Sequence, residues 1–161
     1  MSRRLVNASP LIFLAKLGRL ELLRLGAQEV LVPSGVLEEV RAKPDVGAEL
    51  IERYLGTWLK VCHLTRREVL RFLPDLGEGE KEVIAQALQE DIVSIALDDL
   101  DARRVARRMG LEPIGTVGLL LAARKRSMLP SLKQELEHLK ALGFWVSDSL
   151  YSLALQEAGE E

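Results

Sequence analysis

The stretch Val6–Gly18, VNASPLIFLAKLG, predicts the end of a strand followed at once by a helix. Leu5 and Val6 are typical of a buried strand. Ser9 before Pro10 predicts an N-cap with proline in the first helical turn, where its missing N–H costs nothing. The helix that follows is apolar around nearly its whole circumference and ends at Gly18. We therefore expect it to be buried.

The polar residue between this strand and this helix is Asn7. Open α/β sheets bind ligands at the carboxyl ends of their strands, which is where Asn7 stands. An asparagine at such a point can equally cap a helix or turn the chain. Asn7 alone therefore predicts no site, and its meaning depends on which other residues reach the same sheet edge.

The composition describes an ordinary globular protein of 161 residues, most simply one domain over 1–161. Hydrophobic residues make up 48% and charged residues 29%. No apolar run is long enough to span a membrane and the start lacks a signal-peptide pattern, so we expect a cytoplasmic protein with no membrane segment. The single cysteine excludes an internal disulfide, and two histidines are too few for a zinc site.

The charge balance limits the classes of partner. A formal net charge of −2 argues against a generally basic nucleic-acid binder, but it leaves room for a local basic face or a carboxylate cluster that holds hard metal ions. Aromatic residues make up only 4% of the chain, so we do not expect a stacking platform for single strands.

Strand patterns alternate with helical patterns along the chain. The predicted strands are Glu29–Pro33, Leu59–Leu64, Asp91–Asp99 and Leu111–Gly115. The predicted helices cover 35–43, 66–73, 79–90, 100–110, 116–127, 131–143 and 148–161, with caps at Ser34, at Ser147 or Asp148, and a capping box at Thr65 and Glu68. This alternation predicts an α/β fold in three layers, with a mainly parallel central sheet between helices.

Several acidic residues fall where they could join Asn7. The pair Asp98-Asp99 and the pair Gly115-Thr116 each follow a predicted strand. Glu80 heads the apolar stripe of its helix, formed by Val83, Ile84, Ala87 and Leu88, whereas Glu82 projects to the far side. Glu39 lies nearer the buried side of its helix than Glu38. The alternatives are structural: Glu78, Glu80 and the acids from Asp98 to Asp101 could simply favour a helix dipole. Asp99 could pair with Arg103, and Glu38 or Glu39 could be solvated surface. Together, however, they predict an oxygen-rich site of the kind that binds Mg²⁺ or Mn²⁺ and activates water against a phosphodiester.

Arginines occur in pairs one helical turn apart within Asp101–Gly110. Arg103 stands above Arg107, and Arg104 stands above Arg108. Such like-charge pairs destabilise an isolated helix by roughly 0.2–0.5 kcal/mol each, so an anionic group is expected nearby. It could be a phosphate or an internal carboxylate. A surface on which these arginines are solvated and ion-paired explains the pattern equally well.

Five segments in order resemble the PIN-domain family, and in particular a branch often found as toxins of toxin–antitoxin pairs. They are VNASPLIFLAKLGRLELL, VPSGVLEEV, LGEGEKEVIAQAL, ALDDLDARRVARRMGLEPIGTVGLLLAARKRSML and GFWVSDSLY. The resemblance covers nearly the whole chain. It implies a three-layer α/β/α fold and a metal-dependent ribonuclease with acidic residues around one or two Mg²⁺ or Mn²⁺ ions.

Carried over by position, the resemblance implies a set of site residues. The metal ligands would be Asn7, Glu39, Glu80 (rather than Glu78) and Asp99 with Asp98 close behind, around one cavity, and the same acids would be catalytic. Thr116 and the arginines Arg103, Arg104 and Arg107 would bind the substrate. The general family pattern has aspartate where this chain has Asn7, whose amide can bind a cation but brings no charge.

The acidic residues and the resemblance together predict a metal-dependent ribonuclease. The resemblance implies a toxin whose partners are RNA, an antitoxin protein and a second copy of the chain. Self-association is expected because the apolar first helix offers more hydrophobic surface than a small domain easily covers. Two alternatives remain: a catalytically silent PIN-like module that binds RNA or protein, and a phosphoacceptor receiver domain. The receiver-domain hypothesis is the weaker of these two alternatives, since no lysine is placed after the last predicted strand to support it.

Overall fold

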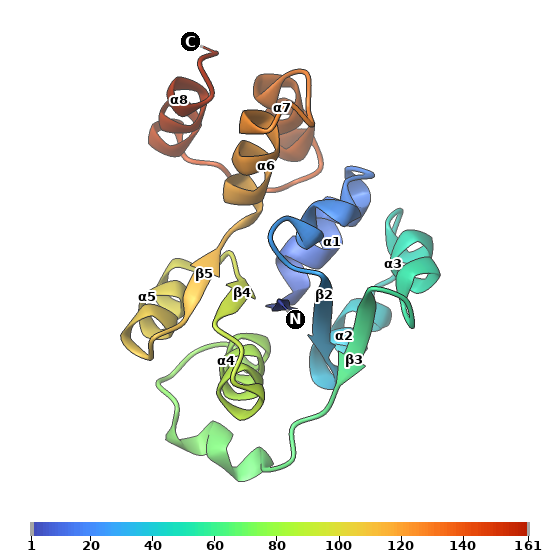
Figure 1. Cartoon of the computed structure of the whole chain (residues 1–161), viewed down its shortest axis with the longest axis vertical. Coiled ribbons are helices and arrows are strands. Elements are labelled where there is room, and N and C mark those ends of the chain that lie inside the picture. The colour runs from blue at the N-terminus through green and yellow to red at the C-terminus, as the bar shows by residue number, and fades with distance from the viewer. Residues whose placement is uncertain (1, 161) are drawn as a thin grey trace.

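The computed structural model describes residues 2–160, so the ends of the predicted 1–161 domain and of the last predicted helix lie outside the described residues. Its strands are β1 (Arg3–Val6), β2 (Glu29–Pro33), β3 (Leu59–Cys62), β4 (Ser94–Ala96) and β5 (Glu112–Ile114). Its α-helices are α1 (Ala8–Lys16), α2 (Ser34–Ala42), α3 (Ala48–Tyr54), α4 (Glu78–Glu90), α5 (Leu100–Arg108), α6 (Thr116–Lys125), α7 (Leu132–Ala141) and α8 (Asp148–Glu157). Two 3-10 helices, η1 (Leu20–Arg24) and η2 (Arg67–Phe72), complete the described elements (Figure 1).

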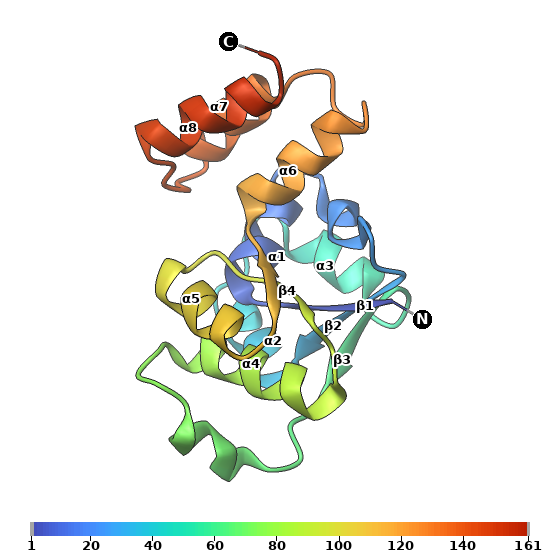
Figure 2. The same cartoon turned by 60° about the vertical axis from the view of Figure 1, so that its left-hand side comes forward.

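The five strands form one parallel sheet in the order β3-β2-β1-β4-β5, which confirms the predicted α/β class. The chain runs from β1 outward to β3, then returns past β1 to β4 and β5. Because crossovers between parallel strands are right-handed, connections that run in opposite directions place their helices on opposite faces. Figure 2 accordingly shows α1 and α4 on opposite sides of β1. The order reverses between β1 and β4, and this switch point is where such sheets bind ligands.

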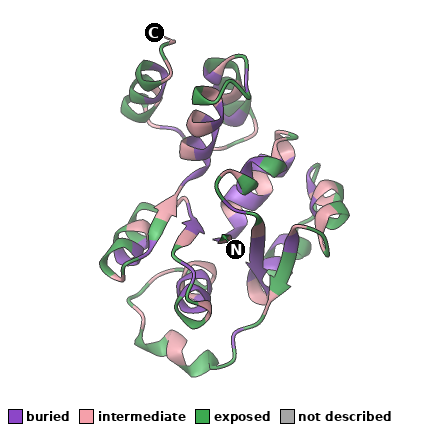
Figure 3. Ribbon diagram, in the orientation of Figure 1, coloured by how far each residue is buried: buried purple, intermediate pink, exposed green. Residues whose placement is uncertain are grey.

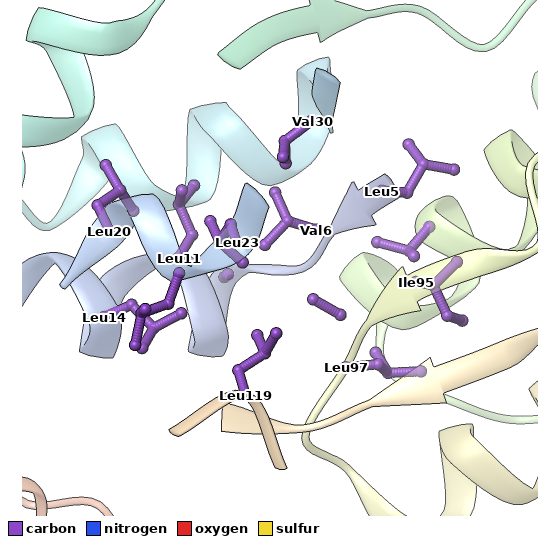
Figure 4. Close-up of a cluster of buried hydrophobic side chains, with 14 of the residues drawn as sticks. Leu5, Val6, Leu11, Leu14, Leu20, Leu23, Val30, Ile95, Leu97 and Leu119 are labelled. Atoms are coloured by element: carbon purple, nitrogen blue, oxygen red, sulfur yellow. The ribbon is translucent and has the colours of Figure 1, made fainter. Parts of the chain in front are cut away.

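The core surrounds β1 and extends into the helices that follow β5. Leu5 on β1, Leu11 on α1 and Ile95 on β4 are fully buried, and Leu119 of α6 is packed into the same cluster (Figure 4). Burial fades toward the outer faces of α5 and α8 and along η2, as Figure 3 shows. Within residues 2–160, none of the helices is long and apolar enough to cross a membrane.

The predicted burial of the first helix is confirmed. Leu11 and Leu14 are completely covered, and α1 contacts α2, α3, α6 and η1. Much of the apolar surface of this helix is therefore covered within the chain, whereas Ile12, Phe13 and Leu17 are only partly buried.

Several local predictions are corrected by tertiary packing. Ser9 lies inside α1 and does not cap it, since Asn7 occupies the N-cap position. The segment after Thr65 forms the 3-10 helix η2, because the backbone N–H of Thr65 donates to Gln89 and no capping box forms. Ser34 is the first residue of α2 and not its cap. β4 is shorter than the predicted Asp91–Asp99, and α3 was not predicted.

Candidate functional site

The candidate site lies at the carboxyl ends of β1 and β4, where the two strands pair in parallel. The Asn7 N–H continues that pairing by donating to the Ala96 carbonyl at 3.0 Å. The Asn7 side chain is only 5% exposed, and its Nδ2 donates to Glu80 Oε2 at 2.8 Å. Its Oδ1 is buried and has no hydrogen-bond partner among the described residues. A buried amide oxygen left unpaired is costly, so this atom marks a position where a ligand would be stabilised.

Glu80 reaches Asn7 from the first turn of α4. Gly79 allows the approach, since a Cβ at that position would lie 2.9 Å from Asn7 Oδ1. The side chain of the neighbouring Glu78 is 84% exposed and pairs with Lys81 at 3.8 Å. Glu80, and not Glu78, is therefore the acid that the turn presents to β1.

Asp98 is an acid near the switch point whose carboxylate accepts three hydrogen bonds. Its Oδ1 accepts a hydrogen bond from the Thr116 N–H at 2.7 Å. Its Oδ2 accepts from the Thr116 hydroxyl at 2.7 Å and from the Ser9 hydroxyl at 2.6 Å. These three donors fix the carboxylate against the starts of α1 and α6. Ser9, which the sequence had suggested as a cap, is thus a site residue that the prediction missed.

Asp99 stands apart from this arrangement. It is the N-cap of α5, and its Oδ2 accepts from the Ala102 N–H at 2.9 Å. It also forms no ion pair of the predicted kind with Arg103 in the part of the chain described. Between the two adjacent acids, the contacts therefore favour Asp98, which reverses the preference drawn from the sequence.

The expected gathering of three carboxylates around one cavity is not found. Glu39 is exposed on α2, and residues 2–160 contain no group of three or more His, Cys, Asp or Glu side chains placed to hold a metal ion. The buried side of α2 is formed by Val36, Leu37 and Val40, which leaves Glu39 on its solvent side. Asn7, which directly follows β1, supplies a neutral amide that donates to Glu80.

The residues that do meet are of the right kind for a hard cation. Carboxylate and amide oxygens are the ligands that Mg²⁺ and Mn²⁺ prefer. Asp98, Glu80 and the unpartnered Asn7 Oδ1 supply such oxygens. Asn7 and Ser9, two positions apart, tether Glu80 and Asp98 to the same short stretch of chain. The donor set therefore fits a divalent cation in chemistry, with one charge fewer than an all-carboxylate set.

Arg103 is the arginine nearest to Asp98. A Cβ at Gly115 would lie 2.8 Å from Arg103 Nη1 and 3.1 Å from Asp98 Oδ1, so both side chains lie against Gly115. Burial lowers the pKa of the Arg103 guanidinium, nearby Arg107 lowers it further, and Asp98 opposes both by raising it. Its Nε is buried with no hydrogen-bond partner among residues 2–160.

The other predicted substrate-binding arginines differ from Arg103. Arg104 is exposed and pairs with Asp101 at 2.8 Å, and Arg107 is exposed. Thr116 is fully buried and holds Asp98 through its hydroxyl. Its contacts are those of a residue that orients an acid.

Glu82 is buried, contrary to the sequence prediction that it projects to the far side. Its Oε1 accepts from the Gly35 N–H at 3.0 Å and lies 3.6 Å from Arg67 Nη1. The prediction was wrong because α4 packs against α2 as well as the sheet, which widens its buried arc and leaves Leu88 half exposed instead. Glu82 joins α2 to α4 and makes no contact with Asp98 or Asn7.

Comparison with known proteins agrees with the fold. A family model described as PIN domain matches residues 3–160. The structure is similar to that of a PilT N-terminus domain protein from the hyperthermophilic archaeon Sulfolobus solfataricus P2, with a TM-score of 0.51 and 16% sequence identity over 75% of this chain and 92% of that chain. At this identity the likeness is one of fold. No curated protein is similar enough to be matched. The family match over nearly the whole chain shows that this protein belongs to the PIN-domain family, whose members are generally metal-dependent nucleases.

Proposed function

We propose that this protein is a Mg²⁺- or Mn²⁺-dependent ribonuclease. The observation that carries the proposal is the unpartnered, buried oxygen of Asn7 beside Glu80 at the switch point where Asp98 is held by three donors. Asp98, Glu80 and Asn7 would hold the cation, and Glu39 would complete the set only if its side chain turned inward. The bound cation would supply a polarised water and stabilise charge on the phosphodiester.

The protein's own residues would prepare this chemistry. Ser9 and Thr116 fix the orientation of the Asp98 carboxylate, so no reorganisation is needed when substrate binds. Arg103, beside Asp98, is placed to contact a non-bridging phosphate oxygen through its guanidinium. Asp99 contributes by capping α5, the helix that carries Arg103.

The proposal is tested by incubating purified protein with labelled single-stranded RNA and Mn²⁺. We expect cleavage by the wild type and at least about a hundredfold slower cleavage by Asp98→Asn and by Glu80→Gln. Glu78→Gln is the control for the turn of α4, and Asp91→Asn is the control for β4. Asp91 is exposed at the opposite end of β4 with φ 56°, a conformation that asparagine accepts. Cleavage that survives Asp98→Asn would refute the proposed site.

A second candidate function is a PIN-like module that binds RNA or protein without cleaving. The observation that favours it is that Asn7 already satisfies one Glu80 oxygen, and Ser9 and Thr116 already satisfy Asp98, without a metal. In the same assay this module would give no Mn²⁺-dependent cleavage by the wild type at any metal concentration.

We further propose that the protein is the toxin of a toxin–antitoxin pair and forms a homodimer in the cytoplasm. The resemblance to a toxin branch supports the first assignment, and exposed apolar side chains away from the candidate site, Leu88 and Val93, support the second. Induced expression should arrest growth with wild type but not with Asp98→Asn. Light scattering should give twice the mass of one chain.

A further inference from the structure

A cleft of about 880 Å³ connects the candidate site to the helices that follow β5. Asp98 and Arg103 line one wall, and the other is formed by α8 and by the segment that joins α7 to α8, including Trp145. Figure 2 shows α5 and the α7–α8 connection on the same side of the β5–α6 junction. The cleft therefore places an aromatic ring opposite the residues assigned to the reaction.

Trp145 is held outward by a well-anchored backbone. Its neighbour Phe144 packs edge-on against Phe13 with ring centroids 5.1 Å apart, Val146 is buried, and Ser147 caps α8 by accepting from the Leu150 N–H. The Trp145 side chain between them is 79% exposed. Tryptophan usually buries its large apolar surface, so an indole presented to solvent on an anchored segment indicates a binding surface.

Four acids and two arginines, Arg103 and Arg104, line the cleft. Of its four acids, Asp99 caps α5, Asp101 pairs with Arg104 at 2.8 Å and Glu157 pairs with Lys125 at 3.2 Å. The fourth acid, Asp98, belongs to the candidate site. Arg104 is engaged by Asp101, whereas Arg103 forms no ion pair within residues 2–160, so Arg103 is the cation of the lining left to meet an anion.

We propose that Trp145 stacks on an unpaired base of single-stranded RNA whose neighbouring phosphate contacts Arg103 beside Asp98. An indole face stacks on any base, and an arginine fork matches phosphate oxygens. A duplex cannot use this surface, since its base faces are already stacked. The low aromatic content of the chain argued against a stacking platform for single strands, but this proposal needs only one aromatic residue. This inference rests on the proposed function and names the substrate class of the same site.

The test measures binding in EDTA, where no divalent ion supports cleavage. Trp58→Phe leaves Trp145 as the sole indole, since the chain has two tryptophans. We expect a single-stranded RNA of about ten nucleotides to quench its fluorescence, and the same sequence as a duplex to leave it unchanged. In the otherwise native chain, Trp145→Ala should weaken binding of that single strand about tenfold, and Trp145→Phe should retain most of the affinity.

Phe72→Ala is the matched control, because Phe72 is equally exposed, at 85%, and does not line the cleft. It should bind RNA like the wild type. The inference is overturned if single-stranded RNA fails to bind, if Trp145→Ala binds it normally, or if Trp145→Ala only dissociates a dimer, which would make this face a contact between copies. Stacking without Mn²⁺-dependent cleavage would uphold the inference and defeat the nuclease proposal. Mn²⁺-dependent cleavage that is unchanged by Trp145→Ala would support the nuclease proposal and refute the role of Trp145.

Discussion

Asn7 decides how the candidate site is held together in the absence of a metal. Its amide donates to Glu80, so one carboxylate is satisfied by a neutral partner and the Asn7 Oδ1 is left without one. An aspartate at this position could not donate, and its carboxylate would stand within hydrogen-bonding distance of Glu80. In the proposed cation site, Asn7 would therefore lower the affinity for metal and stabilise the metal-free protein.

Asn7→Asp should accordingly destabilise the metal-free protein and increase its response to metal. Two adjacent carboxylates repel in a buried setting, and we expect a loss of about 1–3 kcal/mol in the free energy of unfolding without metal. Thermal melts in EDTA and in Mn²⁺ measure both effects. Mn²⁺ should raise the melting temperature of both proteins, and that of the variant more. Adding Glu80→Gln should abolish the extra rise, because the two positions share one ligand. No metal-dependent shift in either protein would contradict this account of Asn7.

Gly115 is needed for close approach and not for its backbone conformation, since its φ of −93° suits any residue. A Cβ there would press on Arg103 Nη1 and Asp98 Oδ1. Gly115→Ala should therefore displace the flexible end of Arg103 at a cost of about 1 kcal/mol in stability, yet lower RNA cleavage at least tenfold. Gly118→Ala, which meets only the side chain of Ile114, is the control. Unchanged cleavage by Gly115→Ala would show that Arg103 has no role in the reaction.

Among the helices, Glu160 joins the segment after α8 to the start of α7. It accepts hydrogen bonds from Leu132 N–H at 2.7 Å, Lys133 N–H at 3.1 Å and Arg124 Nε at 2.9 Å. Desolvation alone would raise the pKa of Glu160, but these hydrogen bonds and one from Ser131 outweigh it and lower the pKa to about 2. The carboxylate thus holds α6, α7 and the segment after α8 together, and this arrangement shapes one wall of the cleft.

Glu160→Gln should lower stability at neutral pH by about 2 kcal/mol, the loss of charge-assisted hydrogen bonds. The folded pKa is depressed, so this stabilisation is present above the unfolded value of 4.5 and is lost as the pH falls toward about 2. Chemical denaturation of both proteins at pH 7 and pH 2.5 measures the difference, which should shrink at the lower pH. Glu157→Gln, in an exposed pair with Lys125, should change stability little. A difference that is the same at both pH values would contradict the assigned role.

Sequence periodicity predicted the strands and helices that are covered on one face or on all sides. It failed to place residues of a helix that is covered by a second neighbour as well as by the sheet. β2 was predicted with its observed bounds, and the cap of α8 at Ser147 is confirmed. Glu82 was misplaced because α2 covers a second side of α4, which no pattern within α4 records. Ser9 was misassigned because a serine before proline has the pattern of a cap, whereas its actual partner, Asp98, is 89 positions away in the chain.

The order of the strands in the whole molecule explains why the site residues come from distant segments. β1 lies between β2 and β4, so the turn after β1 meets the end of β4 and the start of α6 at the carboxyl edge of the sheet. The sequence could predict which residues follow strands, because those positions are local. It could not choose between Asp98 and Asp99, because that choice depends on which carboxylate α5 uses as its cap.

Calorimetric titration of the purified protein with Mn²⁺ tests whether Asp98, Glu80 and Asn7 form a divalent-cation site. We expect saturable binding by the wild type, binding weakened at least tenfold in Asp98→Asn, and unchanged binding in the control Asp91→Asn. Absence of saturable binding by the wild type, or equal binding by Asp98→Asn, would show that these residues form no such site.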